Sequence, residues 1–436
     1  MKSDPIERPS SRWGAFSHRP FAVMWVATTC SLTGIAISDT SSAWLMTSLN
    51  ADPRAVSLVQ VASSLPMFLF TLPAGALADR IEPRTYLIVL ESLVVALMGL
   101  FGCAVFFHWA TPVLLLSTLF ALGVAWSLAA PAWLSITPLL VPQSELAGAN
   151  AANSVGYNFS RAIGPALAGI ALAKLGPAAP YWIFAVADLA SIAALVWWRA
   201  SSRAASNSRH GGLAGAVRDG CRHAARNQNL RATIVRTLAV YPFASAYLAL
   251  LPLVARQQSA GPELYGALLA FISVGAVLGS LALGWMRKRF GADLVVALGT
   301  VGVAIALVLF GLARDPVVAI GAALVAGASW TIVLANLYVA AQVALPDWVR
   351  GRGLAIFLTV IFGSVTFGSA LWGQIAATAG LERAFFAAAV GALVAIPLSW
   401  RWRIEPSGAN ETPAPAQRRP PVPAGAEPGL ASTEGG

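Results

Sequence analysis

The sequence predicts an all-α membrane protein whose twelve transmembrane helices form two six-helix bundles. The prediction rests on an apolar composition, twelve long apolar stretches and an internal repeat. Of the 436 residues, 57% are hydrophobic and 11% are charged, whereas soluble domains carry about 25% charged residues. The mean hydropathy is +0.69. A soluble protein with so little charge could not cover its own surface, so the composition indicates a bilayer.

Twelve apolar stretches are long enough to cross a membrane, since a spanning helix needs about 20 apolar residues. Helices are expected because every backbone N–H and C=O group in lipid must be satisfied within its own segment. Turn-forming pairs such as Asp52-Pro53 and Asp315-Pro316 separate the stretches. The predicted spans are residues 21–49, 55–78, 86–107, 112–140, 146–175, 181–198, 233–254, 265–285, 294–313, 317–345, 353–378 and 384–400.

The distribution of lysine and arginine predicts the orientation. With the N-terminus inside, 22 of the 29 basic residues lie on the inner side and five on the outer side. The remaining two, Arg161 and Arg236, lie in or beside spans. Basic residues mark the cytoplasmic side, so we expect a multi-pass protein of the plasma (cell inner) membrane with both termini cytoplasmic. The net charge of +10 then reflects topology, and no nucleic-acid partner is expected.

The same pattern divides the chain into five parts. Residues 1–20 form a cytoplasmic N-terminal segment without a cleavable signal. A long arginine-rich loop separates two sets of six spans, and the last residues are rich in proline, alanine and glycine, a composition typical of disorder. The remaining parts are an N-terminal bundle (21–198), a cytoplasmic linker (199–232), a C-terminal bundle (233–402) and a disordered cytoplasmic tail (403–436).

The two bundles are related by an internal repeat. At a constant offset of 204 residues, identities align over about fifty positions without gaps. Because six spans return the chain to the same side, both halves have the same orientation, and the axis relating them lies along the membrane normal. Such parallel repeats are typical of transporters whose halves rock around a central site. The most informative pairs are Gly123 with Gly327, Trp126 with Trp330, Gly164 with Gly368, and Gly169 with Gly373.

The end of the second span carries the first motif, Gly75-Ala-Leu-Ala-Asp79-Arg80-Ile-Glu-Pro-Arg84. It resembles the signature of the major facilitator superfamily. The resemblance implies a cytoplasmic gate in which Asp79 bonds across the seam between the halves, with Arg80 and Arg84 beside it. The alternative is an ordinary charged loop on the cytoplasmic side. The corresponding stretch of the second half lacks the acid, so a gate of this kind would be asymmetric.

The fifth span carries the second motif, Arg161-Ala-Ile-Gly164-Pro165-Ala-Leu-Ala-Gly169. It resembles the Gly-Pro motif of antiporters in the same superfamily. Glycine and proline also permit a helix to bend or to pack closely, so plain packing is the alternative. Gly368 and Gly373 are the corresponding residues of the eleventh span.

Further segments narrow the resemblance. They are Trp44-Leu-Met-Thr-Ser-Leu49, Asn158-Phe-Ser-Arg161 and Leu345-Pro-Asp-Trp-Val-Arg-Gly-Arg352. Together with the motifs, they resemble the transmembrane secretion effector branch, to which enterobactin-type exporters belong. The resemblance covers about residues 18–402 and implies efflux of small molecules.

Ionisable residues inside spans are functional candidates. Asp39 lies in a polar run of the first span, and facing lipid would cost about 2.5–3.5 kcal/mol. We therefore expect Asp39 to face a cavity or another helix, as a proton-coupling site or as a structural hydrogen-bond partner. Arg161 needs a partner, which is Asp39, Asp188 or an anionic substrate. Asp188 is a third coupling or substrate candidate, with a structural role as its alternative.

Two other charged residues have simpler expectations. Glu91 lies one turn into the third span, where it could pair with Arg84 or Arg80. Arg236 near the start of the seventh span is expected to extend to the cytoplasmic edge. Among the aromatic residues, the repeated Trp126 and Trp330 are the best candidates for lining a cavity, although packing explains most such residues.

Several activities have no support in the sequence. The three cysteines and four histidines are scattered, so no disulfide, metal site or cofactor is expected. The phosphate-binding and hydrolase motifs are absent from the sequence, which argues against ATP drive and against an enzyme.

The sequence therefore predicts a secondary transporter that exports a small molecule (a drug, siderophore or secondary metabolite) by alternating access. Proton influx is the expected driving force, and Asp39 is the first candidate for the protonated group. Membrane lipids surround a protein expected to be monomeric. A lysophospholipid translocator of the same fold and a membrane sensor or scaffold that does not transport are the alternatives.

Overall fold

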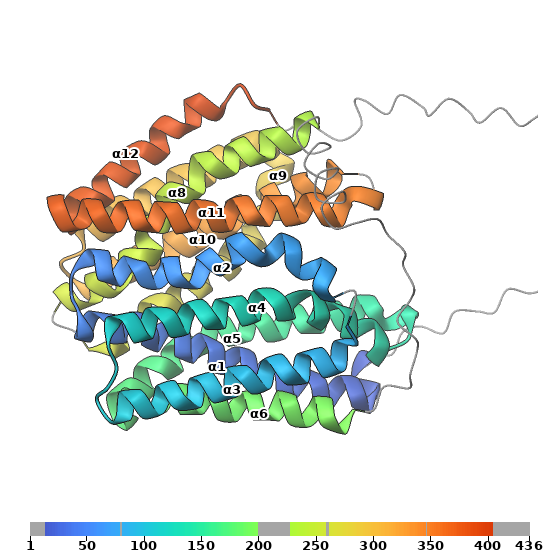
Figure 1. Cartoon of the computed structure of the whole chain (residues 1–436). Helices are drawn as coiled ribbons and strands as arrows, with labels where there is room; N and C mark the ends of the chain where they lie inside the picture. Colours follow the sequence, from blue (N-terminus) through green and yellow to red (C-terminus); the bar gives the residue numbers. More distant parts are fainter. Residues whose placement is uncertain (1–13, 79–80, 199–226, 259–260, 346, 404–436) are drawn as a thin grey trace, which may run out of the picture. The chain divides into compact units, whose positions relative to one another are not determined.

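The structure is a computed structural model that describes residues 14–78, 81–198, 227–258, 261–345 and 347–403. Within these ranges it describes all side chains except those of residues 72, 75–78, 347–349 and 352. The described residues form helices and no strands (Figure 1), which confirms the all-α class. The α-helices are α1 (Arg19–Leu49), α2 (Pro53–Ala78), α3 (Pro83–Phe106), α4 (Pro112–Leu140), α5 (Leu146–Leu175), α6 (Ala179–Trp197), α8 (Gln228–Gln257), α9 (Pro262–Leu312), α10 (Pro316–Val343), α11 (Asp347–Ala379) and α12 (Leu381–Ser399).

Polar residues of the predicted turns begin the helices. The side chain of Thr111 accepts a hydrogen bond from a backbone N–H in the first turn of α4, and Asn227 and Asp315 do the same for α8 and α10. These contacts satisfy N–H groups that have no partner within the helix. Proline follows at the first position of α4 and α10, where its missing N–H costs nothing.

Helix α9 is 51 residues long and contains a sharp break. Gly291 has φ 73° and ψ 170°, which is not helical. Residues with a side chain rarely adopt this backbone conformation, whereas glycine adopts it freely. The break divides α9 into a first arm (262–290) and a second arm (292–312).

Contacts with α10 give the direction of each arm. Along the first arm, contacts with α10 pair Gly275 with Leu324 and Gly279 with Ala328. Both numbers rise together, so this arm runs in the same direction as α10. Along the second arm, contacts with α10 pair Gly299 with Val333 and Gly302 with Ser329. Here one number rises as the other falls, so the second arm runs opposite to α10. The two arms are therefore antiparallel, and the chain reverses at Gly291.

The predicted spans coincide with helical residues. Two of them, 265–285 and 294–313, are the arms of α9. In the described part of the chain, ten helices are long and apolar enough to cross a membrane, with α9 counted once. The remaining helix, α5, has the predicted bounds but is more polar.

The described residues cover the predicted loops only in part. Helix α8 begins at Gln228, inside the range expected to be the linker. Residues 199–226 of that linker and 404–436 of the expected tail lie outside the described residues, as do Asp79 and Arg80 of the expected gate.

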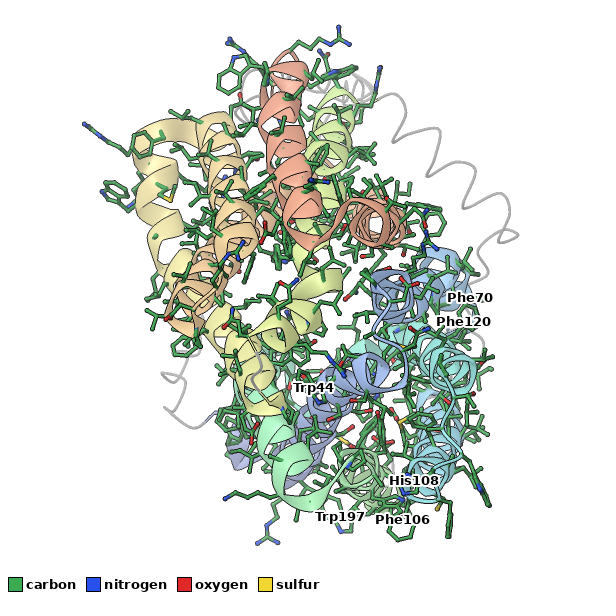
Figure 2. All side chains as sticks on the ribbon, turned by 90° about the vertical axis from the view of Figure 1, so that its left-hand side faces the viewer. Trp44, Phe70, Phe106, His108, Phe120 and Trp197 are labelled. Carbon is green, nitrogen blue, oxygen red and sulfur yellow. The ribbon has the colours of Figure 1, made fainter. Side chains whose placement is uncertain are left out.

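The helices gather into two groups, which we call the first half (α1–α6) and the second half (α8–α12). Figure 2 separates the first half at lower right from the second half at upper left. Successive helices run in alternating directions in Figure 1. We call the side on which α1 begins and α12 ends the termini side, and the side on which α1 ends the far side. Figure 2 views the molecule from the far side.

Two pairs of helices join the halves. Helix α2 packs along α11, and α5 packs along the first arm of α9. Within the first half, α1 contacts α5 and α6, and α2 contacts α4. Each half is thus a helix bundle, and the second and fifth helices of one half meet the fifth and second helices of the other.

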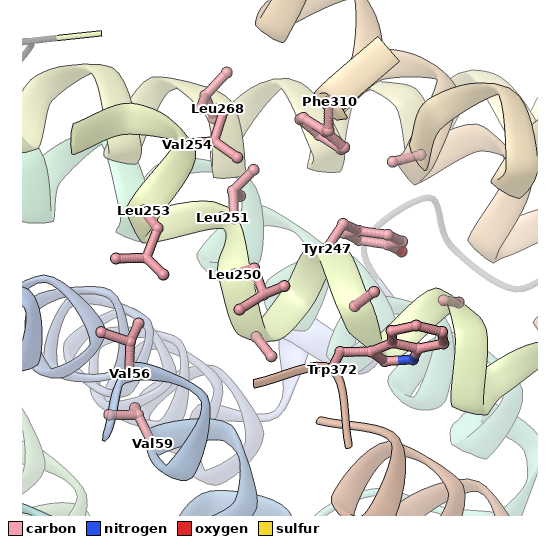
Figure 3. Close-up of a cluster of buried hydrophobic side chains, with 14 of the residues drawn as sticks. Val56, Val59, Tyr247, Leu250, Leu251, Leu253, Val254, Leu268, Phe310 and Trp372 are labelled. Atoms are coloured by element: carbon pink, nitrogen blue, oxygen red, sulfur yellow. The ribbon is translucent and has the colours of Figure 1, made fainter. Parts of the chain in front are cut away.

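A hydrophobic core extends across the join. Val56 and Val59 of α2 belong to the same buried cluster as Leu250 and Leu253 of α8 and Trp372 of α11. Figure 3 shows these side chains converging from both halves. One buried cluster is therefore continuous between the halves, and a second buried cluster lies within the first half.

Large apolar side chains also cover the outside of the helices. Leu134 is 78% exposed and Leu281 is 75% exposed. Water would disfavour apolar surface on this scale, but lipid tails match it. The exposed face therefore fits the hydrocarbon core of a bilayer.

Candidate functional site

The Gly-Pro motif of α5 contacts both halves at once. Gly164 lies against Ala36 of α1, and Gly169 lies against the backbone of Pro262 at the start of α9. A Cβ atom added at either position would lie as close to its nearest neighbour as Cβ atoms ever come in proteins, or closer. Pro165 lies between these two glycines. The motif therefore holds α5 close to α1 in its own half and to α9 in the other half.

The corresponding residues of α11 make the corresponding contacts. Gly368 lies against Pro242 of α8, the first helix of the second half, and Gly373 lies against Ser57 of α2. In each half, the fifth helix thus uses one glycine for its own first helix and the next for the second helix of the other half. Small residues permit such close approach in membrane helices.

Further contacts close the far side between the halves. The guanidinium of Arg256 at the end of α8 donates a hydrogen bond to the carbonyl of Thr47 at the end of α1. Nearby, the ring of Trp44 stacks on that of Tyr265 with centroids 6.2 Å apart. Figure 2 shows Trp44 where the two groups of helices meet. These contacts join α1, α8 and α9 at the far side.

A hydrogen bond joins the halves nearer the middle of the helices. The hydroxyl groups of Ser64 in α2 and Thr366 in α11 lie 2.7 Å apart, and both residues are buried. Next to this pair, Phe68 and Phe367 meet edge to face with centroids 5.7 Å apart. The join between α2 and α11 therefore extends from the far side to the middle of the helices.

Asp39 and Arg161 lie where the two halves face each other. Both side chains are exposed, although α1 and α5 pack against each other. Asp39 lies within electrostatic range of Arg161 and of Tyr265 in the second half. No ion pair joins these two described side chains; the Arg161 guanidinium instead donates to the hydroxyl of Tyr157 at 3.2 Å. The backbone carbonyl of Arg161 accepts a hydrogen bond from Ser273 of α9 at 2.9 Å.

Asp188 lies elsewhere, inside the first half. It is only 1% exposed, and its Oδ1 accepts a 2.6 Å hydrogen bond from Ser31 of α1. Its neighbour across the bundle is Glu91 of α3, which lies within electrostatic range. The expected pairing of Arg161 with Asp188 is not formed by these described side chains. The structure separates the three candidates into an exposed pair and a buried acid.

Glu91 does not bond to Arg84 as expected. Its Oε1 accepts a 2.8 Å hydrogen bond from the indole N–H of Trp133 in α4. A cavity of about 370 Å³ opens beside it and is lined by residues of α1, α3, α4, α5 and α6. Sequence reasoning missed Glu91 as a site residue, because helical spacing alone does not tell which helix faces α3.

Trp126 and Trp330 occupy the interiors of their own halves. Trp126 lines the cavity beside Glu91. Trp330 meets the buried Tyr241 edge to face, with ring centroids 4.6 Å apart. Of the two expected cavity aromatics, the structure brings one to a cavity and packs the other against tyrosines.

Of the expected gate residues, Gly75 lies near the end of α2, and Arg84 has a described side chain. Its Nε donates to the carbonyl of Leu195 at 2.7 Å, and its Nη2 donates to that of Val196 at 3.1 Å. These carbonyls belong to the last turn of α6, where the helix has no further N–H groups to bond to them. Arg84 therefore caps a helix of its own half.

Arg236 is buried rather than extended to an edge. It is 2% exposed, forms an ion pair with Asp293 at 2.9 Å, and donates to the carbonyl of Trp402 at 2.8 Å. The buried charge of the second half is thus matched by an acid. Among the described residues, no group of three or more His, Cys, Asp or Glu side chains is placed to hold a metal ion.

Two helix bundles that meet along paired helices, with charged side chains on the faces between them, define a transmembrane transporter of the major facilitator type. The model of the transmembrane secretion effector family matches residues 10–427. The chain belongs to this family.

Named relatives and solved structures agree with this assignment. The multidrug efflux pump Tap of Mycolicibacterium fortuitum is 26% identical over 388 residues, covering 84% of this chain and 92% of Tap. The enterobactin exporter EntS of Citrobacter koseri is 24% identical over 367 residues, covering 83% of this chain and 86% of EntS. The nucleoside transporter NupG has a TM-score of 0.72 at 10% identity, covering 88% of this chain and 99% of that one, which shows a shared fold.

Proposed function

We propose that this protein exports small molecules across the plasma membrane by alternating access, and that proton entry drives the export. The observation that carries the proposal is the exposed pair of Asp39 and Arg161 between two halves that are closed at the far side. The relatives named as a multidrug efflux pump and an enterobactin exporter support export over uptake.

Alternating access requires two bodies that move against each other. Twelve spans follow if α5 and both arms of α9 cross the membrane. Gly164 and Gly368 make equivalent contacts in their two halves, and so do Gly169 and Gly373. This equivalence supports the repeat of 204 residues. In this proposal the two halves are related by an axis along the membrane normal and rock about the α2–α11 and α5–α9 joins.

The distribution of lysine and arginine supports a cytoplasmic location for the termini side. The far side is then the outside, and the closed far side corresponds to a transporter that receives its substrate from the cytoplasm. Export follows when the far side opens and the termini side closes. The motif with Asp79, Arg80 and Arg84 would help to close the termini side, with Arg84 holding the end of α6 in place.

Asp39 is the proposed proton carrier on the surface between the halves. A carboxylate near a guanidinium can hold a proton or release it, depending on what else occupies the site. In the proposed cycle, Asp39 releases its proton to the cytoplasm and substrate enters. A new proton from outside then expels the substrate. Arg161 positions the carboxylate and any anionic group of the substrate.

The test is proton flux in everted membrane vesicles containing the full-length protein, followed with a pH-quenched dye. The added compounds are lipophilic cations, catecholate siderophores and lysophospholipids. We expect one compound class to release protons through the wild-type protein. Asp39→Asn should reduce this flux at least about tenfold, which corresponds to about 1.4 kcal/mol of lost coupling.

The matched control is Asp315→Asn, since asparagine caps a helix about as well as aspartate and Asp315 lies at the start of α10. This variant should keep the wild-type flux. Unchanged flux in Asp39→Asn would remove Asp39 from the coupling step. Proton-independent movement of lysophospholipids would instead identify a lipid translocator.

A further inference from the structure

We propose that the cavity inside the first half binds a hydrophobic organic cation. The carboxyl pair of Glu91 and Asp188 supplies the opposite charge, and this pair holds a proton when the cation is absent. The proposal rests on the proposed export function and names a substrate class for it. It concerns a site apart from the exposed Asp39–Arg161 pair.

The carboxyl pair is built into the bundle rather than lying on its surface. Glu91 is held by the indole N–H of Trp133 at 2.8 Å, and Asp188 by the hydroxyl of Ser31 at 2.6 Å. The second oxygen of Asp188, Oδ2, is buried, and no N–H or hydroxyl group of the described residues donates to it. A buried carboxylate oxygen without a donor is costly. This oxygen is therefore an acceptor that a proton or a cation would satisfy.

No basic side chain balances the pair. The titratable residues that line the cavity are Glu91 and Tyr157, and its described lining contains no Lys, Arg or His. Among the helices around the pair, α1 contributes Arg19 and Asp39, and α4 contributes no charged residue. Helix α3 contributes Arg84, whose guanidinium bonds to the end of α6. Helix α5 contributes Arg161, whose guanidinium binds the Tyr157 hydroxyl and acts on Asp39, and Lys174 at its far end.

Two carboxyl groups in a low-dielectric interior do not both hold a negative charge without compensation. One added positive charge relieves the repulsion, and a proton is the smallest such charge. An organic cation that enters the cavity supplies the same charge, so the proton leaves. One monovalent cation then exchanges for one proton, and charge is conserved.

The cavity has the size and lining of an organic-cation site. Its volume of about 370 Å³ lies within the range of about 300–1,000 Å³ that is usual for small-molecule sites. Trp25, Trp126 and Trp133 line it together with Phe21 and Phe184. Aromatic faces attract cations, most strongly when the pair is out of water. A hydrophobic cation is therefore favoured over a neutral or anionic molecule of the same shape.

The test measures binding to the purified full-length protein in lipid nanodiscs by isothermal titration calorimetry. The probe is benzyltrimethylammonium, and neopentylbenzene is its neutral counterpart of the same shape. Titrations in two buffers with different ionisation enthalpies give the number of protons released. We expect the cation to bind with release of about one proton and the neutral compound to bind at least about tenfold more weakly.

Variants locate the site. Glu91→Gln and Asp188→Asn should each weaken cation binding at least about tenfold and abolish proton release. The two substitutions provide independent tests, and thermal unfolding verifies that each variant is folded. Glu382→Gln is the matched control, because this acid forms an exposed ion pair with Arg314, and its binding and proton release should equal those of the wild type.

Three results would overturn the proposal: absence of cation binding to the wild-type protein, binding without proton release, or binding unchanged in both acid variants. Transport separates this failure from failure of the proposed function. If both variants still exchange protons for another compound class in everted vesicles, export stands and the cavity is not its cation site. If cations bind as expected but no compound moves protons, the site stands and the proposed export fails.

Discussion

Individual charged residues have different surroundings in the two halves. Arg236 in the second half has an acid, Asp293, and a carbonyl within bonding distance. In the first half, Glu91 and Asp188 bond to neutral donors and face each other. The matched pair suits a structural role, whereas the unmatched acids suit groups that gain and lose a charge. This contrast, rather than burial alone, separates structural from functional candidates.

The matched pair gives a prediction for stability. Arg236→Gln should lower the free energy of unfolding by about 3 kcal/mol, because it removes the ion pair with Asp293 and the hydrogen bond to the Trp402 carbonyl. The measurement is the thermal unfolding midpoint in detergent. The exposed Arg289 provides the control, since Arg289→Gln should leave the midpoint nearly unchanged. Equal midpoints for the two variants would show that the pair contributes little.

At the scale of helices, composition and turn residues predict most of the fold. The helix α4 begins at Pro112 and ends at Leu140 as predicted, because proline and a capping threonine mark its start. The partners of a helix are harder to predict. From the sequence, Glu91 could pair with Arg84 or Arg80, but Arg84 bonds to α6 and Glu91 to α4. Such contacts depend on the rotation and neighbours of each helix, which one sequence does not contain.

The break in α9 shows the same limit. The two predicted spans were correct as helical residues, but their connection at a single glycine was not expected. The predicted bounds left residues 286–293 between the two spans as a loop. Gly291 alone, with its positive φ, allows a reversal without one.

This position gives a prediction for backbone conformation. Gly291→Ala should lower the free energy of unfolding by about 1–3 kcal/mol, the cost of placing a side chain in that region of φ and ψ. No atom of the described residues lies near enough to clash with the added methyl group, so the cost is conformational. Thermal unfolding measures it.

Gly321 provides the comparison, since it also has open space around it but lies inside the helix α10. Gly321→Ala should leave the unfolding midpoint unchanged or raise it, because alanine favours helix over glycine. A midpoint for Gly291→Ala as high as that of Gly321→Ala would contradict the assigned role of Gly291.

At the scale of the whole molecule, function depends on motion between the halves. The joins of α2 with α11 and of α5 with α9 would form the line about which they rock. When the far side opens, α2 and α11 must move against each other along their join, so a covalent link between them should stop transport without touching any charged residue.

Ser64 and Thr366 are suited to this test because their hydroxyl oxygens are 2.7 Å apart across the join. In Ser64→Cys/Thr366→Cys, mild oxidation should form a disulfide and abolish compound-dependent proton flux in vesicles, and a reductant should restore it. Cross-linking is measured by the change in gel mobility after a protease cut in the linker.

The single variants Ser64→Cys and Thr366→Cys are the controls and should transport under both conditions. Continued transport by the fully cross-linked double variant would exclude relative movement of α2 and α11 as part of the cycle.

The glycine contacts of α5 and the serine contact of α2 also bear on biosynthesis. Ribosomes make the first half before α9 and α11 exist, so the faces around Gly169 and Ser57 first meet lipid instead of their partners. Small residues leave shallow grooves there that bulky lipid chains fill poorly. A newly inserted first half therefore carries two surfaces that lack their partner helices, and each accepts a helix of complementary shape. Membrane insertion of the second half completes them, which makes the order of synthesis part of how the two halves find each other.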